Sequence, residues 1–178
     1  MPVYMATLHS YGSWKEDDPN GYIQRNEGLK VPNEALARWR EKHRSQDAVR
    51  FEHSSQEELQ AVLAEIAQER KLRLHASATT PTHTHGIVSF RNPACQCGAG
   101  SNYCASDCLA RQDMEKFITH LKRVSGYRLG KLLKITGRKW FSRGWDLTRV
   151  TDEAHLDYLL NVYLPKHVEE NGIVRVYQ

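Results

Sequence analysis

The 178-residue chain lacks several features that would assign it to a specialised class of protein. It has no run of about 18 apolar residues, which argues against a membrane-spanning helix. Its start, Met1 to Met5, has neither the charged first residues nor the apolar core of a signal peptide. Internal repeats and low-complexity segments are also absent. We therefore expect a cytoplasmic protein without membrane contact.

Cysteine is scarce and is confined to one segment, 91–111, which we expect to be a loop. Its four cysteines are Cys95, Cys97, Cys104 and Cys108. In a reducing cytoplasm, clustered cysteines favour Zn²⁺ over disulfides. The spacing is shorter than that of a standard zinc ribbon, so a structural Zn²⁺ site and loop thiols without metal both stay open.

Acidic residues are almost absent between positions 122 and 149, where Asp146 is the only one. The basic residues of this segment are Lys122, Arg123, Arg128, Lys131, Lys134, Arg138, Lys139, Arg143 and Arg149. Interleaved with them are Tyr127, Trp140, Phe141 and Trp145. Cations among aromatic rings are typical of a surface that binds a polyanion with unstacked bases. A solvated helix face followed by a basic loop is the alternative.

The spacing of apolar residues predicts amphipathic helices over 56–69 and 112–125. Ser55 and Glu58 have the positions of a capping box at the start of the first. A shorter helix is expected over 33–44. Thr151 is expected to cap a last helix that contains residues 155–167.

Alternating apolar and polar residues predict strands over 3–14, 72–78 and 83–90, and a further strand within 138–150. The order of strands and helices is then βαββαβ, followed by one extra helix. This is the ferredoxin-like α+β plan, in which two helices cover one face of an antiparallel sheet. A chain of this length and composition, 40% hydrophobic, forms one core, so we expect a single domain over 1–178.

Two histidines, His83 and His85, stand two residues apart at the start of the predicted strand 83–90. Side chains alternate along a strand, so both imidazoles project from the same face. Two imidazoles side by side can serve as ligands of a divalent cation. The alternative is a chance pair on an edge strand, with no function.

The last predicted helix presents Tyr163 and His167, which are four residues apart and share a face if the helix continues past Pro165. Proline can instead kink the helix at that point. Tyr163 also continues an apolar stripe at helical spacing, formed by Leu156, Leu159 and Leu160. On periodicity alone, a core tyrosine is therefore the simpler interpretation.

Four stretches resemble, in order, a known family. Thr82 to Val88 resembles the HUH motif (histidine, any residue, histidine) of single-tyrosine transposases, which include the REP-associated tyrosine transposases. Segments 8–14 and 140–150 resemble the family's opening strand and the segment before its last helix. Segment 163–167 resembles the helix that carries its catalytic tyrosine. Thr84 departs from the usual hydrophobic middle residue, and the cysteine-bearing insertion is not a general family feature.

The resemblance implies a DNA transposase with an additional C-terminal catalytic helix. His83, His85 and His167 would bind Mg²⁺ or Mn²⁺, and Tyr163 would attack single-stranded DNA to form a 5′-phosphotyrosyl intermediate. Tyr158, five residues earlier, stays open as the nucleophile. Single-stranded or hairpin DNA would contact Lys122, Arg123, Arg128, Lys131, Lys134, Arg138, Lys139 and Arg143. Whether the enzyme works as a monomer or a homodimer is left open.

Two other functions use the same residues. Replication initiators and relaxases share the chemistry of two histidines and a tyrosine. A nucleic-acid-binding protein that has lost catalysis would keep the basic segment alone. The presence of His83, His85 and Tyr163 favours an active enzyme over the last alternative.

Overall fold

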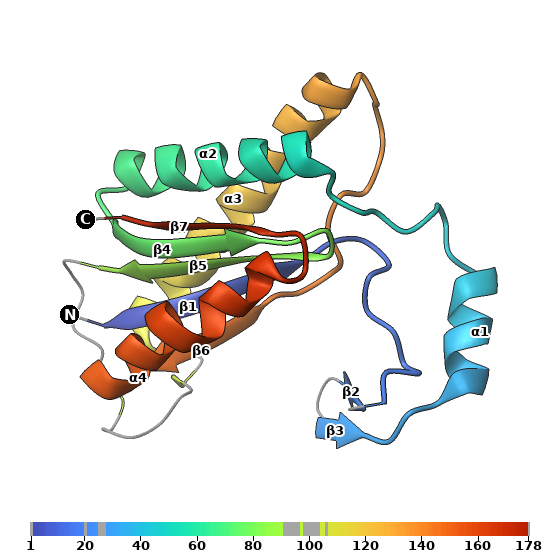
Figure 1. The fold of residues 1–178 in the computed structure, drawn as a ribbon, viewed down its shortest axis with the longest axis horizontal. Helices are drawn as coiled ribbons and strands as arrows, with labels where there is room; N and C mark the ends of the chain where they lie inside the picture. Colours follow the sequence, from blue (N-terminus) through green and yellow to red (C-terminus); the bar gives the residue numbers. More distant parts are fainter. Residues whose placement is uncertain are drawn as a thin grey trace.

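The computed structural model describes residues 2–19, 21–24, 28–90, 97, 104–105 and 107–177. At its centre is a five-stranded antiparallel sheet with the strand order β6-β1-β5-β4-β7 (Figure 1). The strands are β1 (Val3–His9), β4 (Arg73–Thr79), β5 (His83–Ser89), β6 (Asp146–Val150) and β7 (Ile173–Val176). Without β7, these strands and the two long helices between them form the predicted ferredoxin-like α+β arrangement.

The two faces of the sheet are covered by different helices (Figure 1). Helices α2 (His53–Glu69) and α3 (Leu109–Leu133) pack on one face, over a core that includes Tyr4, Leu63 and Phe117. The other face is covered by the terminal helical segment, which is α4 (Glu153–Tyr158) continued by a π turn and a 3-10 turn. The terminal helical segment therefore occupies the face that α2 and α3 leave open.

Strand β7 was not predicted. It pairs with β4, so that Ala76 lies opposite Val176 and Thr79 opposite Ile173. The chain therefore returns to the sheet after the terminal helical segment, and this segment is held between β6 and β7.

Several boundaries differ from the predictions. The capping box is wrong: α2 begins at His53, and Ser55 is buried within it instead of capping it. Asp152, rather than Thr151, caps α4, since its carboxylate accepts a hydrogen bond from the His155 N–H. Strand β1 ends at His9, because the chain turns at Gly12, whose φ of +73° favours glycine.

Helix α3 is the largest difference. It runs for 25 residues to Leu133 instead of ending near 125. Its second half buries Leu121, Ser125 and Leu129, four residues apart, and turns the basic residues between them outward. The charges hid this narrow buried stripe, so the helix was predicted to end near 125 although it continues through the basic residues to Leu133.

A smaller unit lies beside the sheet, formed by α1 (Glu34–Lys42) and a short hairpin of β2 (Tyr22–Gln24) and β3 (Gly28–Lys30) (Figure 1). Helix α1 was predicted, and its N-cap is Asn33. No strand was predicted over the residues of the hairpin. An ion pair between Arg40 and the buried carboxylate of Glu16 joins α1 to the chain after β1. None of the described helices has the length and apolar composition needed to cross a bilayer.

Gly172 tests how tightly the terminal segment is fastened to the sheet. A Cβ at this position would lie 2.6 Å from the His167 carbonyl oxygen and 2.9 Å from that of Thr79. Gly172→Ala should therefore lower the free energy of unfolding by about 1–3 kcal/mol, as overpacking does. Urea denaturation measures the change.

Gly126→Ala is the matched control for this prediction. A Cβ there meets only Trp140 Cδ1, at 3.4 Å, and the position is inside a helix. Alanine should be neutral or add about 1 kcal/mol to the stability. Equal effects of the two substitutions would contradict the close packing at Gly172.

Candidate functional site

The pairing of β1 with β5 determines what surrounds the two predicted histidines. In this antiparallel register His83 lies opposite His9, and His85 lies opposite Thr7. All four side chains share the sheet face on which the terminal helical segment packs, while Thr84 belongs to the other face. Strand β5 therefore places His83 and His85 on the same face of the sheet, as the sequence predicts.

The side chains of Tyr163 and His167 come from the terminal helical segment and lie over the row formed by His9, His83, Thr7 and His85. The segment is α-helical to Tyr158, forms a π turn over Leu159–Tyr163 and tightens into a 3-10 turn over Leu164–Val168. Pro165 stands at the start of the 3-10 turn, so the proline marks a change of helix type and the segment continues past it. Buried Leu159 and Leu164 anchor the segment against the sheet.

Each of the three histidines is held through its Nδ1 atom. His85 Nδ1 lies 2.8 Å from Thr7 Oγ1, and His83 Nδ1 lies 2.9 Å from Thr82 Oγ1. His167 Nδ1 donates to the Leu164 carbonyl oxygen at 3.1 Å. A hydrogen bond at one ring nitrogen orients the ring and directs the other nitrogen, Nε2, toward a ligand.

The Nε2 atoms of His85 and His167 are 3.0 Å apart. One ligand nitrogen from each of His83, His85 and His167 lies within 4.8 Å of the others. This triad, which comes from β5 and the 3-10 turn, could hold a metal ion. In the part of the chain that the structure describes, no carboxylate belongs to this group. Three imidazoles form a nitrogen-rich donor set, which suits transition-metal ions better than Mg²⁺.

Burial keeps the two strand histidines, His83 and His85, uncharged at neutral pH. Loss of solvent, followed by the neighbouring imidazoles of His167 and His9, lowers the pKa of His83 to about 4. The pKa of His85 is lowered well below its ordinary value, again mainly by burial. A neutral imidazole has the lone pair that a metal requires, so a metal need displace no proton from these two rings at pH 7.

Tyr163 lies against two members of the triad. Its ring centroid is 5.5 Å from that of His85 and 5.1 Å from that of His167. The ring is half-buried and also packs on the apolar cluster between the segment and the sheet. Tyr163 is therefore both a core residue and a neighbour of the triad. Burial, and then the negative charge of Glu170, raises the pKa of its phenol. Tyr158, the other candidate, is 49% exposed.

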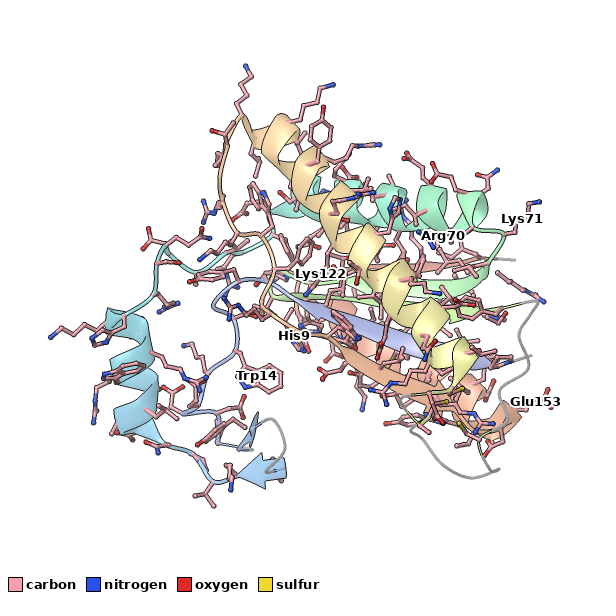
Figure 2. All side chains as sticks on the ribbon, turned by 180° about the vertical axis from the view of Figure 1, so that it is seen from behind. His9, Trp14, Arg70, Lys71, Lys122 and Glu153 are labelled. Atoms are coloured by element: carbon pink, nitrogen blue, oxygen red, sulfur yellow. The ribbon has the colours of Figure 1, made fainter. Side chains whose placement is uncertain are left out.

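The sequence reasoning missed a histidine–carboxylate pair beside the triad. His9 Nε2 lies 2.9 Å from Asp146 Oδ2, at the start of β6, and the His9 ring meets that of Trp14 edge to face at 4.9 Å. Figure 2 shows His9 and Trp14 together at the end of β1. His9 is two residues after Thr7, so its side chain projects from the same face of β1. Its place at the site depends on the pairing of β1 with β5 and β6.

The predicted basic segment supplies both sides of an open groove. The groove has a volume of about 610 Å³ and lies between the second half of α3 and the chain that follows it. Gly126 and Gly130 lie along it on α3, and its polar and aromatic lining residues include Lys122, Tyr127, Lys131, Arg138, Trp140 and Phe141. The Arg138 guanidinium carbon lies 5.5 Å from the centre of the Trp140 ring. No acidic side chain lines it within the described ranges.

Not all of the predicted DNA-binding cations face this groove. Arg128 is paired with Glu58 and Glu65 of α2, so its charge joins two helices. Half-buried Lys122 donates to the carbonyl oxygens of Ser142 and Gly144.

The remaining predicted cations are more exposed. Arg123 is hydrogen-bonded to His120, and Lys139 to Ser45. Lys134 ends α3 in a left-handed conformation, and Lys131 and Arg143 are exposed. Only Lys122, Lys131 and Arg138 of the predicted set line the groove.

Three of the four cysteines come together. The Sγ atoms of Cys97, Cys104 and Cys108 lie within 4.8 Å of one another. Cys95, the fourth predicted ligand, is outside the described residues. The three sulfurs lie on the face of the sheet that carries α2 and α3, away from the histidines.

Comparisons with known proteins add one similar structure. No family model matches the sequence, and no curated protein matches it. A solved structure of a REP-associated tyrosine transposase bound to a REP hairpin is similar, with a TM-score of 0.44 and 9% identity. The match covers 93% of this chain and 68% of that chain.

The buried, neutral state of His83 predicts a loss of stability in acid. Its pKa is about 4 in the folded protein and 6.5 ordinarily, so the unfolded chain takes up the proton first as the pH falls. In metal-free buffer the free energy of unfolding should fall between about pH 6.5 and 4, by on the order of 3 kcal/mol. Urea unfolding at a series of pH values measures the decline, which should be shallower in His83→Gln. Identical pH profiles for the two proteins would refute the assignment.

Proposed function

We propose that the protein cuts and rejoins single-stranded DNA through a covalent bond to Tyr163, as a single-tyrosine transposase does. The observation that carries the proposal is the meeting of Tyr163 with three convergent imidazoles. A phenol against a metal-binding triad is the arrangement needed to attack a phosphate whose charge is neutralised. The four stretches of sequence that resemble the transposase family support the same function.

The roles of the residues follow from their positions. His83, His85 and His167 would hold a divalent cation, which polarises the scissile phosphate and stabilises developing negative charge. Tyr163 Oη would form the new bond to phosphorus while the bond to the 3′-oxygen breaks, leaving a 5′-phosphotyrosine and a 3′-hydroxyl. Attack by another 3′-hydroxyl would reverse the step and join strands. The bond energy is kept in the phosphotyrosine, so joining would need no ATP.

The donor set distinguishes between the two expected ions. Mg²⁺ prefers oxygen ligands and retains water, whereas imidazole nitrogen suits transition-metal ions. We therefore favour Mn²⁺ over Mg²⁺ as the ion that the triad holds most tightly. Nδ1 hydrogen bonds to Thr7 and Thr82 would keep the two strand imidazoles in place before the ion binds.

The groove on α3 is the proposed contact with DNA. Lys131 and Arg138 supply charge for phosphate, and Trp140 and Tyr127 supply faces for unstacked bases. Arg138 Nε is buried and has no hydrogen-bond partner among the described residues. A buried donor without a partner is costly. The observation marks Arg138 as a residue that the fold leaves unsatisfied, whereas Arg128 is paired with two glutamates.

Replacement of Tyr163 tests the chemistry. Incubation with Mn²⁺ and a suitable single strand should give a protein–DNA adduct that survives denaturation. Tyr163→Phe should abolish this adduct, because it removes the attacking oxygen and leaves the ring that packs on the core. The fold and DNA binding should remain. Adduct formation is followed by the shift of labelled DNA on a denaturing gel.

Tyr158→Phe is the matched control, since Tyr158 is exposed and lies one element earlier on the same helical segment. It should retain the adduct. An adduct that persists in Tyr163→Phe and is lost in Tyr158→Phe would move the nucleophile. No adduct with any strand or metal would leave a nucleic-acid-binding protein without catalysis.

Replacement of a groove arginine tests the DNA contact. Arg138→Ala should weaken binding to single-stranded DNA and lower the slope of log affinity against log salt by about one, the value expected for one phosphate contact. Fluorescence anisotropy at several salt concentrations measures both quantities. Arg128→Ala removes the same charge from a site where two glutamates already pair it, so it should leave the slope unchanged. Equal effects would place the DNA elsewhere.

A further inference from the structure

The geometry points to a structural zinc site formed by the thiolates of Cys97, Cys104 and Cys108. Their sulfurs lie within 4.8 Å of one another. Zinc–sulfur bonds of about 2.3 Å in a tetrahedron place sulfur atoms about 3.8 Å apart, which this cluster can supply with small adjustments. Three thiolates are soft ligands that select Zn²⁺ over the hard cations of oxygen sites. The proposal is independent of the function proposed for the histidines.

The cluster is built into the fold at three points. Cys104 is 7% exposed, and its sulfur lies 3.2 Å from the Tyr4 hydroxyl of β1. Its carbonyl oxygen accepts a hydrogen bond from Arg111 of α3 at 2.6 Å. The Cys97 carbonyl oxygen accepts one from Arg149 of β6 at 3.1 Å. The cluster is thus attached to β1 through the Cys104 sulfur, and to α3 and β6 through backbone carbonyl oxygens.

The start of α3 adds an electrostatic contribution. Cys108 is the N-cap residue of this 25-residue helix, where the positive end of the helix dipole stabilises a thiolate. The Cys108 N–H donates a hydrogen bond to the carbonyl oxygen of Ala105, the residue after Cys104. This bond holds the backbone next to both cysteines close together, and their sulfurs lie within 4.8 Å of each other.

The cysteine cluster and the histidine triad are separate sites. Tyr4, beside Cys104, and His9, beside the triad, stand at opposite ends of β1, about 17 Å apart along an extended strand. The cluster packs with the core under α2 and α3, whereas the triad is on the other face of the sheet. Zinc at the cysteines would therefore fix the insertion between β5 and α3 without touching the triad.

Elemental analysis of the full chain, purified without chelator, tests the proposal. The wild type should contain about one zinc per chain at this site. The double variant His83→Ala/His85→Ala should retain it, because the triad is not its ligand. In the background of this double variant, where the triad cannot hold zinc, Cys97→Ser and Cys108→Ser, both at partly exposed positions, should each reduce the zinc content to background. Circular dichroism verifies that the variants are folded.

Titration of native wild-type protein with a mercurial reagent avoids the risk that a variant misfolds. Zinc release, followed with a chromogenic chelator, should rise in step with modification of the thiols. Cobalt in place of zinc should give an intense sulfur-to-metal charge-transfer band, which histidine ligands alone do not produce. Absence of zinc from the wild type would overturn the proposal. So would zinc that is lost in the histidine variant and kept in both cysteine variants.

Discussion

The pairing of β1 with β5 is the constraint on which the site depends. It sets His9 opposite His83 and Thr7 opposite His85, so the same register both assembles the row of imidazoles and supplies a hydrogen-bond partner to His85. A shift of one residue would turn every side chain of β1 to the other face and exchange this polar row for the apolar residues that pack under α2 and α3. The pairing of β1 with β5 therefore determines both the stability of the sheet and the geometry of the site.

Local sequence was sufficient for part of this site. The two-residue repeat of a strand places His83 and His85 on one face wherever the strand lies, and helical spacing brings Tyr163 near His167. Contacts between residues far apart in the chain could not be predicted from local spacing. His9 and Asp146 are 137 positions apart and meet only because β1 lies between β5 and β6. The π turn that positions Tyr163 is likewise set by packing on the sheet, and α3 was underestimated because its buried stripe is only one residue wide.

Charge count alone also misjudged the basic segment. The sequence predicts a polyanion surface from the number of lysines and arginines, but the structure uses several of them internally. Arg128 joins α3 to α2 through Glu58 and Glu65, and Lys122 fastens the chain after Trp140 to α3. What remains for a ligand is narrower: a groove along two glycines of α3, with Arg138 stacked on Trp140. Whether a lysine or arginine forms an ion pair within the fold can be judged only when the positions of the acidic residues around it are known.

The attachment of the terminal helical segment has a topological consequence. It begins directly after β6 and ends in β7, and both strands belong to the same sheet. Tyr163 and His167 thus sit in a loop of chain whose two ends are tethered, not on a free tail. Exchanging this segment between two copies of the protein would require β7 to leave β4.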